Sequence, residues 1–372
     1  MGRAANRPSV RIENDIQAME LALEWATRAM FTTSPNPRVG CVIVKDGHLI
    51  GAGCTQPPGQ AHAEVQALND AASRGTDVRG STVYVTLEPC SHYGRTPPCA
   101  DTLIRAGVAK VVMAVSDPNP LVGGQGCAKL EAAGIEVVSG VLEEQAREMN
   151  IGFLSRMQTG KPWVRMKAAA SLDGRTALHN GVSQWITSVP ARDDGHWWRA
   201  RACAVLTGIG TIVEDDPQLT VRAVETSRQP RRIVIDSRLQ ISPDARILEG
   251  GGTWVVAAVS NPEKEQQLRE RGAEVILLPN EAGKVDLPAL MLELGARQIN
   301  ELHVEAGFKL NGSLIREGCV DELLLYLAPS LLGDARGLFD LPALERLEGR
   351  KTLSFHEIKQ IGPDLRILAR FS

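Results

Sequence analysis

Hydrophobic and polar positions follow two different periods along this chain, and the first part alternates between them. Apolar residues recur at helical spacing over 14–31, where Asn14 or Asp15 can cap the helix. Further helices are expected over 62–73, 98–106, 127–133 and 143–153, and strands over 41–45, 48–51, 82–87, 109–115 and 135–139. Asp46-Gly47 between the first two strands predicts a hairpin turn. This order predicts an α/β/α layer domain over residues 14–155.

The second part of the chain repeats strand and helix patterns after a stretch, residues 155–161, that is typical of a linker and is followed by Pro162. Strands are expected over 162–170, 203–207, 231–235, 253–258, 274–278, 299–304 and 321–328, helices over 190–199, 262–271, 287–295 and 309–317, and a closing hairpin over 352–358 and 365–371. Alternation of this kind predicts a mostly parallel sheet with a nucleotide-sized crevice, in a second α/β domain over residues 161–372.

Composition narrows the class of protein. The chain has 372 residues, of which 43% are hydrophobic, enough for two domains with cores of their own. The net charge is −3 without a basic block, which argues against a dedicated nucleic-acid binder. Its seven cysteines are scattered, unlike a secreted disulfide framework, and no apolar run approaches the ~20 residues of a membrane span. A cytoplasmic protein without a membrane segment is therefore expected.

The strongest chemical signal lies between residues 61 and 99. His62, Cys90 and Cys99 can supply three ligands to a tetrahedral zinc and leave the fourth position for water, as a catalytic zinc requires. Glu64, two residues after His62, is free to act as general acid and base, the pattern of zinc deaminases. Two alternatives stay open, namely a structural zinc knuckle and unrelated reduced cysteines with a core histidine. His92 is a fourth ligand, a substrate-facing residue or a packed loop residue.

The spacing of His62 and Glu64 restricts the local structure. Residues two apart point to different faces in the middle of a helix, so the pair can converge only at a helix start. Pro57-Pro58-Gly59 breaks the chain just before, and a good helical sequence follows from Val65. Cys90 follows a β run and is therefore expected at the carboxyl end of a strand. One feature departs from the usual deaminase pattern, because eight residues rather than two separate the cysteines.

The second part carries weaker chemical signals. After residues 207 and 304 a β run is followed by glycine and then a helix, an arrangement whose backbone N–H groups bind phosphate well. Neither is a dinucleotide-binding fingerprint. Arg199 and Arg222 are either surface arginines or a clamp for a substrate phosphate. Trp185 either packs in the core or stacks on an aromatic ring.

Taken together, these motifs resemble the bifunctional riboflavin biosynthesis deaminase/reductase family. In the first part the resemblance rests on Asn36-Pro37-Arg38-Val39-Gly40, His62-Ala63-Glu64 and the run from Glu88 to Cys99, whose eight-residue gap is that family's own form. In the second part it rests on Lys167, Gly174-Arg175-Thr176, Ser183-Gln184-Trp185-Ile186-Thr187, Asp215-Asp216-Pro217, Ile235-Asp236-Ser237 and Glu305-Ala306-Gly307. It covers nearly the whole chain.

The resemblance implies a cytidine-deaminase fold for the first domain and a zinc-dependent deamination of a diaminopyrimidinone that carries a phosphoribosylamino group. His62, Cys90 and Cys99 would bind Zn²⁺ and Glu64 would move the proton. Asn36 and His92 would meet the pyrimidine, and Arg95 the phosphate.

For the second domain the resemblance implies a dihydrofolate-reductase-like fold that uses NADPH to reduce the ribosyl group to ribityl. The residues expected to face NADPH are Ala169, Trp185, Thr211, Asp215, Ser237 and the turn Gly307, Phe308, Lys309, Leu310, Asn311, Gly312 and Ser313. Those expected to face the substrate are Lys167, Ser183, Arg199, Leu219, Arg222 and Glu305. Phe308 is bulky where the backbone should approach the pyrophosphate. Glu305 would mainly position the ribose hydroxyls.

Family members commonly self-associate, so the resemblance also implies a homo-oligomer that acts on a small pyrimidine ribonucleotide, with no nucleic acid and no membrane as partner. Two alternatives come from other classes. One is a zinc deaminase of nucleic acid or free nucleotides with an accessory nucleotide-binding domain. The other is a non-catalytic protein whose first domain is stabilised by zinc.

Overall fold

The two parts expected from the sequence are separate units in the computed structural model, which describes residues 11–92, 97–119 and 123–372. The division falls between Thr159 and Gly160. Residues 155–159, expected as linker, instead belong to helix α6 (Ile151–Thr159). Helical spacing continues through this stretch, and the first glycine that ends it is Gly160, with φ of 74°.

The first unit is a five-stranded sheet in the order β2-β1-β3-β4-β5. Its strands are β1 (Gly40–Lys45), β2 (His48–Cys54), β3 (Thr82–Val85), β4 (Lys110–Met113) and β5 (Glu136–Ser139). Strand β1 pairs antiparallel with β2 and β3, whereas β3, β4 and β5 are parallel. The predicted hairpin turn between β1 and β2 is confirmed, since Asp46 and Gly47 both have positive φ.

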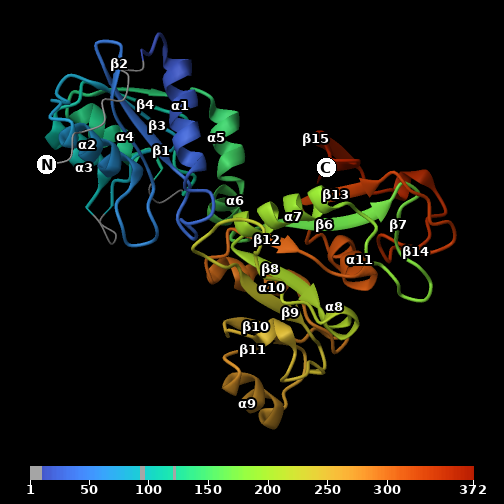
Figure 1. The fold of residues 1–372 in the computed structure, drawn as a ribbon. Coiled ribbons are helices and arrows are strands. Elements are labelled where there is room, and N and C mark those ends of the chain that lie inside the picture. The colour runs from blue at the N-terminus through green and yellow to red at the C-terminus, as the bar shows by residue number, and fades with distance from the viewer. Residues whose placement is uncertain (1–10, 93–96, 120–122) are drawn as a thin grey trace, which may run out of the picture. The chain divides into compact units, whose positions relative to one another are not determined.

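Helices cover both faces of this sheet, which confirms the α/β/α layers (Figure 1). Helices α1 (Asp15–Thr27) and α5 (Glu143–Met149) lie on one face, and α2 (Ala63–Ser73), α3 (Cys99–Ala106) and α4 (Gln125–Ala132) on the other. Helix α1 starts as predicted, with the Asn14 side chain accepting the Gln17 N–H, but it ends at Thr27 rather than at Phe31. Glycines bring α2 close to the sheet, because a Cβ on Gly51 would lie 2.4 Å from the Ala67 carbonyl oxygen.

The second unit is a nine-stranded sheet in the order β11-β10-β9-β8-β12-β6-β13-β16-β15. The strands are β6 (Trp163–Ser171), β8 (Ala204–Gly208), β9 (Arg231–Ile235), β10 (Thr253–Ala257), β11 (Glu274–Leu277), β12 (Glu301–Val304), β13 (Glu322–Ala328), β15 (Leu353–Ile361) and β16 (Asp364–Phe371). All are parallel except β16 and β15, which form the predicted closing hairpin. A small separate pair is formed by β7 (Arg175–Ala177) and β14 (Arg336–Gly337).

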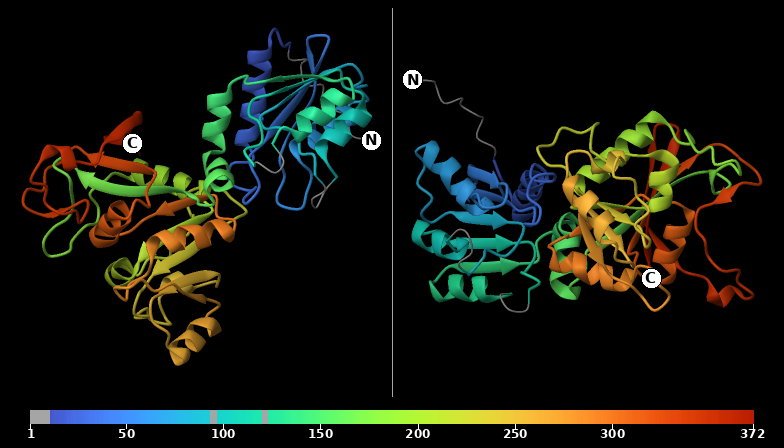
Figure 2. Two further views of the ribbon diagram at one scale, coloured as in Figure 1. Left: turned by 180° about the vertical axis from the view of Figure 1, so that it is seen from behind. Right: turned by 90° about the horizontal axis from the view of Figure 1, so that it is seen from below.

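Alternate residues of β6 separate two environments. Val164, Met166 and Ala168 pack with α10 (Leu287–Ala296) and α11 (Phe308–Arg316) in an apolar core. Arg165 and Lys167 point the other way, toward the face that carries α7 (Val189–Arg201) and, nearer the sheet edge, α8 (Ile209–Asp215) and α9 (Pro262–Glu270). Figure 2 shows these helices from two further directions. The polar face of the sheet below α7 supplies much of the site described below.

Candidate active sites

Three candidate zinc ligands meet at one point in the first unit. The Nδ1 atom of His62 lies 3.6 Å from Cys90 Sγ and 3.4 Å from Cys99 Sγ. A tetrahedral zinc with its usual bond lengths holds nitrogen and sulfur donors about 3.6 Å apart. The three donors therefore fit a zinc ion, and among the described residues they are the group that could hold a metal.

Each ligand sits at the end of a secondary-structure element. His62 is the N-cap of α2, with extended φ and ψ, so it can turn toward the same point as Glu64 in the first turn of the helix. Cys90 follows the end of β3, and Cys99 is the first residue of α3. The Cys99 backbone N–H donates to Cys90 Sγ at 3.3 Å. The prediction that His62 and Glu64 converge at a helix start is confirmed.

The electrostatics of the cluster favour metal binding by Cys90. Hydrogen bonding from the Cys99 thiol, together with His62, lowers the pKa of Cys90 to about 4. A thiolate is the form of cysteine that binds metals. Glu64 is only 4% exposed, and this burial, reinforced by Cys90, raises its pKa to about 7. A carboxyl group with such a pKa can both take and return a proton near neutral pH.

His92 and Asn36 lie outside this group of donors. His92 is exposed two residues after Cys90, and Asn36 lies in the loop between α1 and β1, where its N–H bonds the Thr33 carbonyl. Their contact with the pyrimidine stays a prediction, and Arg95 lies outside the described residues. A cluster of three ligands leaves room for water, as catalytic zinc sites do. That geometry disfavours both a structural knuckle and unrelated cysteines.

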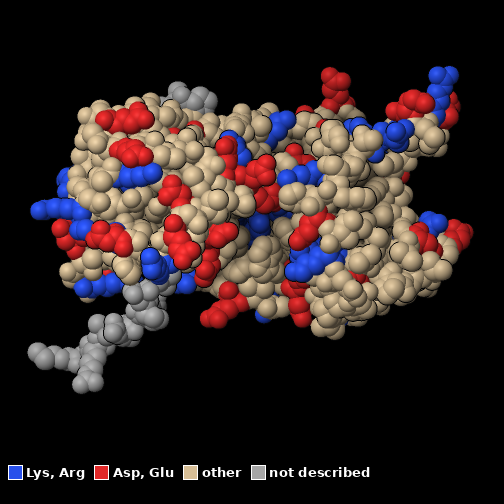
Figure 3. All heavy atoms as spheres, turned by 90° about the horizontal axis from the view of Figure 1, so that it is seen from above, with Lys and Arg blue, Asp and Glu red and all other residues tan. Residues whose placement is uncertain are grey.

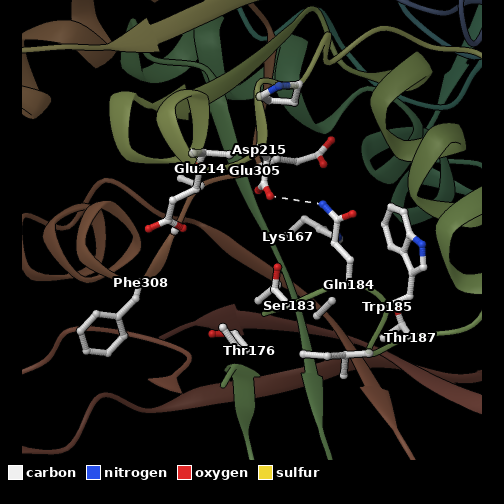
Figure 4. Close-up of a pocket in the computed structure, with 18 of the residues that line it drawn as sticks. Lys167, Thr176, Ser183, Gln184, Trp185, Thr187, Glu214, Asp215, Glu305 and Phe308 are labelled. Atoms are coloured by element: carbon white, nitrogen blue, oxygen red, sulfur yellow. Dashed lines mark hydrogen bonds between the residues drawn. The ribbon is translucent and has the colours of Figure 1, made fainter. Parts of the chain in front are cut away.

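The second unit contains a pocket of about 740 Å³. Figure 4 shows Lys167, Ser183 and Glu305 between Trp185 and Phe308 in this pocket. Trp185 is 69% exposed and its ring lies 4.4 Å from the Arg192 guanidinium, so it belongs to the pocket wall rather than to the core. The pocket is as large as cofactor sites usually are.

A charged group lies on the floor of the pocket. The Arg199 guanidinium donates to both oxygens of Glu305, at 2.7 and 2.9 Å. Burial alone would raise the pKa of Glu305, but Arg199 and the neighbouring His303 hold it well below its ordinary value. Burial lowers the pKa of Lys167, which interacts with this pair. The site therefore keeps a fixed carboxylate beside a lysine that readily gives up a proton.

Two basic residues differ in what they can offer to a phosphate. The Arg199 guanidinium already forms hydrogen bonds with Glu305, and it also donates to the Thr220 carbonyl at 2.7 Å. Arg222 is exposed, and within the described part of the chain its guanidinium donates only to the Thr220 hydroxyl. His196 Nδ1 accepts the Arg222 backbone N–H at 3.3 Å. Arg222 is thus the more available phosphate ligand of the two.

Most residues predicted for the second site do line the pocket. They are Ala169, Trp185, Thr211, Asp215, Gly307, Phe308 and Asn311 from the cofactor set, and Lys167, Ser183, Arg199, Leu219, Arg222 and Glu305 from the substrate set. Five others do not line it: Ser237, Lys309, Leu310, Gly312 and Ser313.

The reason lies in α11, which starts at Phe308, one residue before the helix predicted over 309–317, so that most of the turn expected over Gly307–Ser313 belongs to a helix. Leu310 faces the core, and a Cβ on Gly312 would lie 2.3 Å from the Asp340 carbonyl oxygen. Gly307, the N-cap of α11, lines the pocket, so the N-terminus of this helix lies at the pocket wall. Within the described residues, the buried Asn311 Oδ1 has no hydrogen-bond partner. Free helix N–H groups and an unpartnered oxygen fit a dinucleotide. Ser237 follows β9 and its hydroxyl accepts the Val285 N–H at 3.1 Å.

The pocket also includes residues that were not singled out as site residues. Arg192, Arg246 and Arg336 add positive charge to its wall, and Gln184 donates to Asp215 at 3.2 Å (Figure 4). They come from three distant segments, so spacing along the sequence gave no signal for them.

The charges on the surface are mixed. On the face shown in Figure 3, acidic and basic side chains are interspersed rather than gathered into one basic area. None of the helices in the described part of the chain has the length and hydrophobicity of a membrane span.

Comparison with protein families agrees with both sites. Residues 12–115 match the cytidine and deoxycytidylate deaminase zinc-binding region. Residues 162–367 match the RibD C-terminal domain, which covers more than half of the chain.

Whole proteins are similar over nearly their full length. The riboflavin biosynthesis protein RibD of Escherichia coli is 48% identical over 361 residues, which are 93% of this chain and 96% of that protein. The RibD protein of Haemophilus influenzae is 46% identical, with 95% and 96% covered. The structure of Acinetobacter baumannii RibD, form 1, superposes with a TM-score of 0.88 at 42% identity, covering 96% of this chain and 99% of that one. A diaminohydroxyphosphoribosylaminopyrimidine deaminase/5-amino-6-(5-phosphoribosylamino)uracil reductase from Thermotoga maritima gives 0.84 at 30% identity, with the same coverage.

Proposed function

The chain belongs to the RibD family of bifunctional riboflavin biosynthesis enzymes, and we propose from this membership how its residues divide the two reactions. The enzyme deaminates 2,5-diamino-6-(phosphoribosylamino)pyrimidin-4-one with zinc and then reduces the ribosyl group to ribityl with NADPH. The observation that carries the assignment is that one chain holds both a three-ligand zinc cluster and a large charged pocket. A nucleic-acid deaminase is not favoured by these relatives.

In the first unit, His62, Cys90 and Cys99 hold zinc, which when bound lowers the pKa of its water toward ~7. Glu64 would hold the proton removed from the attacking water and would return it to the amino group that leaves the ring as ammonia. Burial suits Glu64 to this exchange because its pKa of about 7 lies near the working pH.

In the second unit, bound NADPH would be the source of the hydride for C1′ of the opened sugar, and the chain would have to supply the proton that the imine nitrogen requires. Lys167 is the candidate donor, since burial lowers its pKa and favours proton release. Glu305, oriented by Arg199, positions the ribose hydroxyls, and Arg222 binds the phosphate. Trp185 and the N-terminus of α11 face the cofactor.

NADPH oxidation in a single mixture with the diaminopyrimidinone substrate tests this division. The wild type should oxidise NADPH, and Cys90→Ser should not unless the already deaminated substrate is supplied. A wild type that oxidises no NADPH even with deaminated substrate would refute the reductase assignment, and a fully active Cys90→Ser would refute the zinc site.

We also propose that the chain forms a homo-oligomer through the edge strand β15. This nine-residue strand is the last of its sheet, and Phe355 and Ile358 are 71% and 57% exposed on it. Unpaired edge strands that expose large apolar side chains favour pairing with another chain. Light scattering after chromatography should show an oligomer for the wild type and a smaller species for Phe355→Asp. A wild-type monomer would contradict the proposal.

A cytoplasmic location is proposed from the cysteines. None of the seven forms a disulfide in the structure. Seven cysteines outside disulfides are typical of a reducing compartment. Fractionation of cells that produce the protein, with marker enzymes for each fraction, measures the location directly.

A further inference from the structure

A buried carboxylate stands two residues before a zinc ligand. Glu88 is 5% exposed and precedes Pro89 and Cys90. Both of its oxygens accept backbone N–H groups from elsewhere in the chain. Its Oε2 accepts from Asp117 at 2.9 Å and Gly124 at 3.0 Å, and its Oε1 accepts from Gly126 at 3.0 Å and Cys127 at 3.3 Å. Such a saturated carboxylate ties separate segments together.

Three of these four donors belong to the start of one helix. Gly124 is the N-cap of α4, and Gly126 and Cys127 lie in its first turn. The N-cap glycine has no side chain that could accept these N–H groups, so the carboxylate from the end of β3 takes that role. The positive end of the helix dipole further favours the negative charge of Glu88.

The same contacts bring α4 into close packing with Pro89, the residue before Cys90. A Cβ on Gly126 would lie 2.2 Å from the Pro89 carbonyl oxygen and 3.1 Å from Glu88 Oε1. The Glu88 backbone N–H donates to the Val115 carbonyl at 2.8 Å, which fixes the residue to the chain after β4. Residues 88–90 are therefore held from two sides, by α4 and by the end of β4.

We propose that Glu88 is a positioning residue of the deamination site, which holds Pro89 and Cys90 against the N-terminus of α4 so that Cys90 Sγ is in place opposite His62 and Cys99. The inference rests on the proposed assignment of Cys90 as a zinc ligand. Glu88 itself contacts neither metal nor substrate in this role. It acts by reducing the freedom of the loop that carries the thiolate, as outer partners of metal ligands do.

Replacing one carboxylate oxygen of Glu88 by an amide NH₂ distinguishes a positioning role of Glu88 from a general stabilising role. In Glu88→Gln the amide NH₂ would face two N–H donors, so two of the four hydrogen bonds are lost and two donors oppose each other. The zinc dissociation constant of the full chain should rise by about 10–100-fold, the usual result of losing such a partner. Competition with a chromophoric chelator measures this, and the thiolate–cobalt absorption of the Co²⁺-loaded chain reports the geometry independently of activity.

A matched control is Asp15→Asn, in which Asp15 accepts a 2.7 Å hydrogen bond from Tyr84 of β3, the strand that leads to Glu88. This control should keep wild-type zinc affinity and cobalt absorption even if it lowers the melting temperature. Equal zinc affinities for wild type and Glu88→Gln would overturn the proposal, as would equal losses in Glu88→Gln and Asp15→Asn, since a general stabilising role predicts both.

Two further measurements keep the result interpretable. Reductase turnover on deaminated substrate should stay at the wild-type value in Glu88→Gln, which shows that the second unit has folded and that the defect is confined to the first. If Glu88→Gln does not accumulate, Glu88→Asp retains the charge but is one methylene shorter, and its zinc affinity should also fall. If Cys90→Ser retains zinc-dependent deamination, the ligand assignment fails instead, and that outcome is distinct from normal zinc binding by Glu88→Gln.

Discussion

The candidate ligands and the candidate acid/base of the deamination site come from one stretch, residues 62–99, whereas the candidate reductase pocket is lined by side chains between Lys167 and Leu338. In the first site the donors meet because a helix start, a strand end and a second helix start face the same point. In the second, neighbouring parallel strands place Lys167 of β6 and Glu305 after β12 side by side, and α7 adds Arg199. The first site depends on local geometry and the second on sheet order.

The two sites also use charge differently. The zinc cluster combines thiols, an imidazole and one buried carboxyl, so a bound cation would compensate the negative charge. In the pocket the charges of Glu305 and Arg199 compensate each other, so Lys167 and Arg222 remain available to interact with ligands. Substitutions should therefore act on one reaction at a time; three of them test this, and a fourth tests how the charges around the pocket affect stability.

The largest effect is expected for Glu64→Gln. The amide cannot take the proton of the zinc-bound water, so deamination should fall by about 10²–10⁴-fold. Zinc content and reduction of deaminated substrate should stay unchanged. Ammonia release and NADPH oxidation measured on the same preparation check both halves. Normal ammonia release would exclude the proposed role of Glu64, and a parallel loss of reduction would show that the sites are coupled.

Lys167→Met should affect the other reaction. Methionine fills a similar volume without a donor, and loss of a positioned acid typically costs at least about 10²-fold. The kcat for NADPH oxidation with deaminated substrate should fall accordingly while ammonia release persists. Arg336→Gln serves as control, because Arg336 also lines the pocket but pairs with Glu214 at 3.6 Å. If both variants lose the same activity, Lys167 contributes only to the charge of the pocket.

A smaller and more selective effect is expected for Arg222→Ala. A hydrogen bond to a charged group contributes about 1.5–3 kcal/mol, which corresponds to at least about a tenfold change in affinity. The KM for the phosphorylated substrate should rise by that factor, whereas the KM for NADPH should change little. Steady-state kinetics with each reactant varied in turn distinguish the two. Equal increases would place Arg222 at the cofactor instead.

The smallest effect concerns pH. Burial, followed by Arg199 and Arg222, lowers the pKa of His196 from 6.5 to about 4. Between these values the unfolded chain binds a proton that the folded chain does not, so the free energy of unfolding decreases as pH falls through this range. His196→Asn should reduce that dependence in urea unfolding at pH 7 and pH 5. His179→Asn, at an exposed histidine, should leave it as in the wild type.

The sequence predicted most of the elements, and its errors have local causes. The helix expected to reach Phe31 ends at Thr27, and the residues taken for a linker extend α6 to Thr159. Lys309, Leu310, Gly312 and Ser313 were expected at the cofactor from the family resemblance, but in the structure they belong to α11 and do not line the pocket. Periodicity locates elements well but says little about which helix face meets a ligand.

The sequence by itself predicted the candidate zinc ligands as a group, because their spacing and the breaks around them restrict His62 and Glu64 to a helix start. It also determined the family through motifs spread over the whole chain. Only the tertiary structure decided that Arg199 is committed to Glu305, that Arg222 is available, and that Glu88 joins Cys90 to the start of α4. The contact of Glu88 with Gly126 and that of Arg199 with Glu305 join residues 38 and 106 positions apart, where the packing of strands and helices sets the distances.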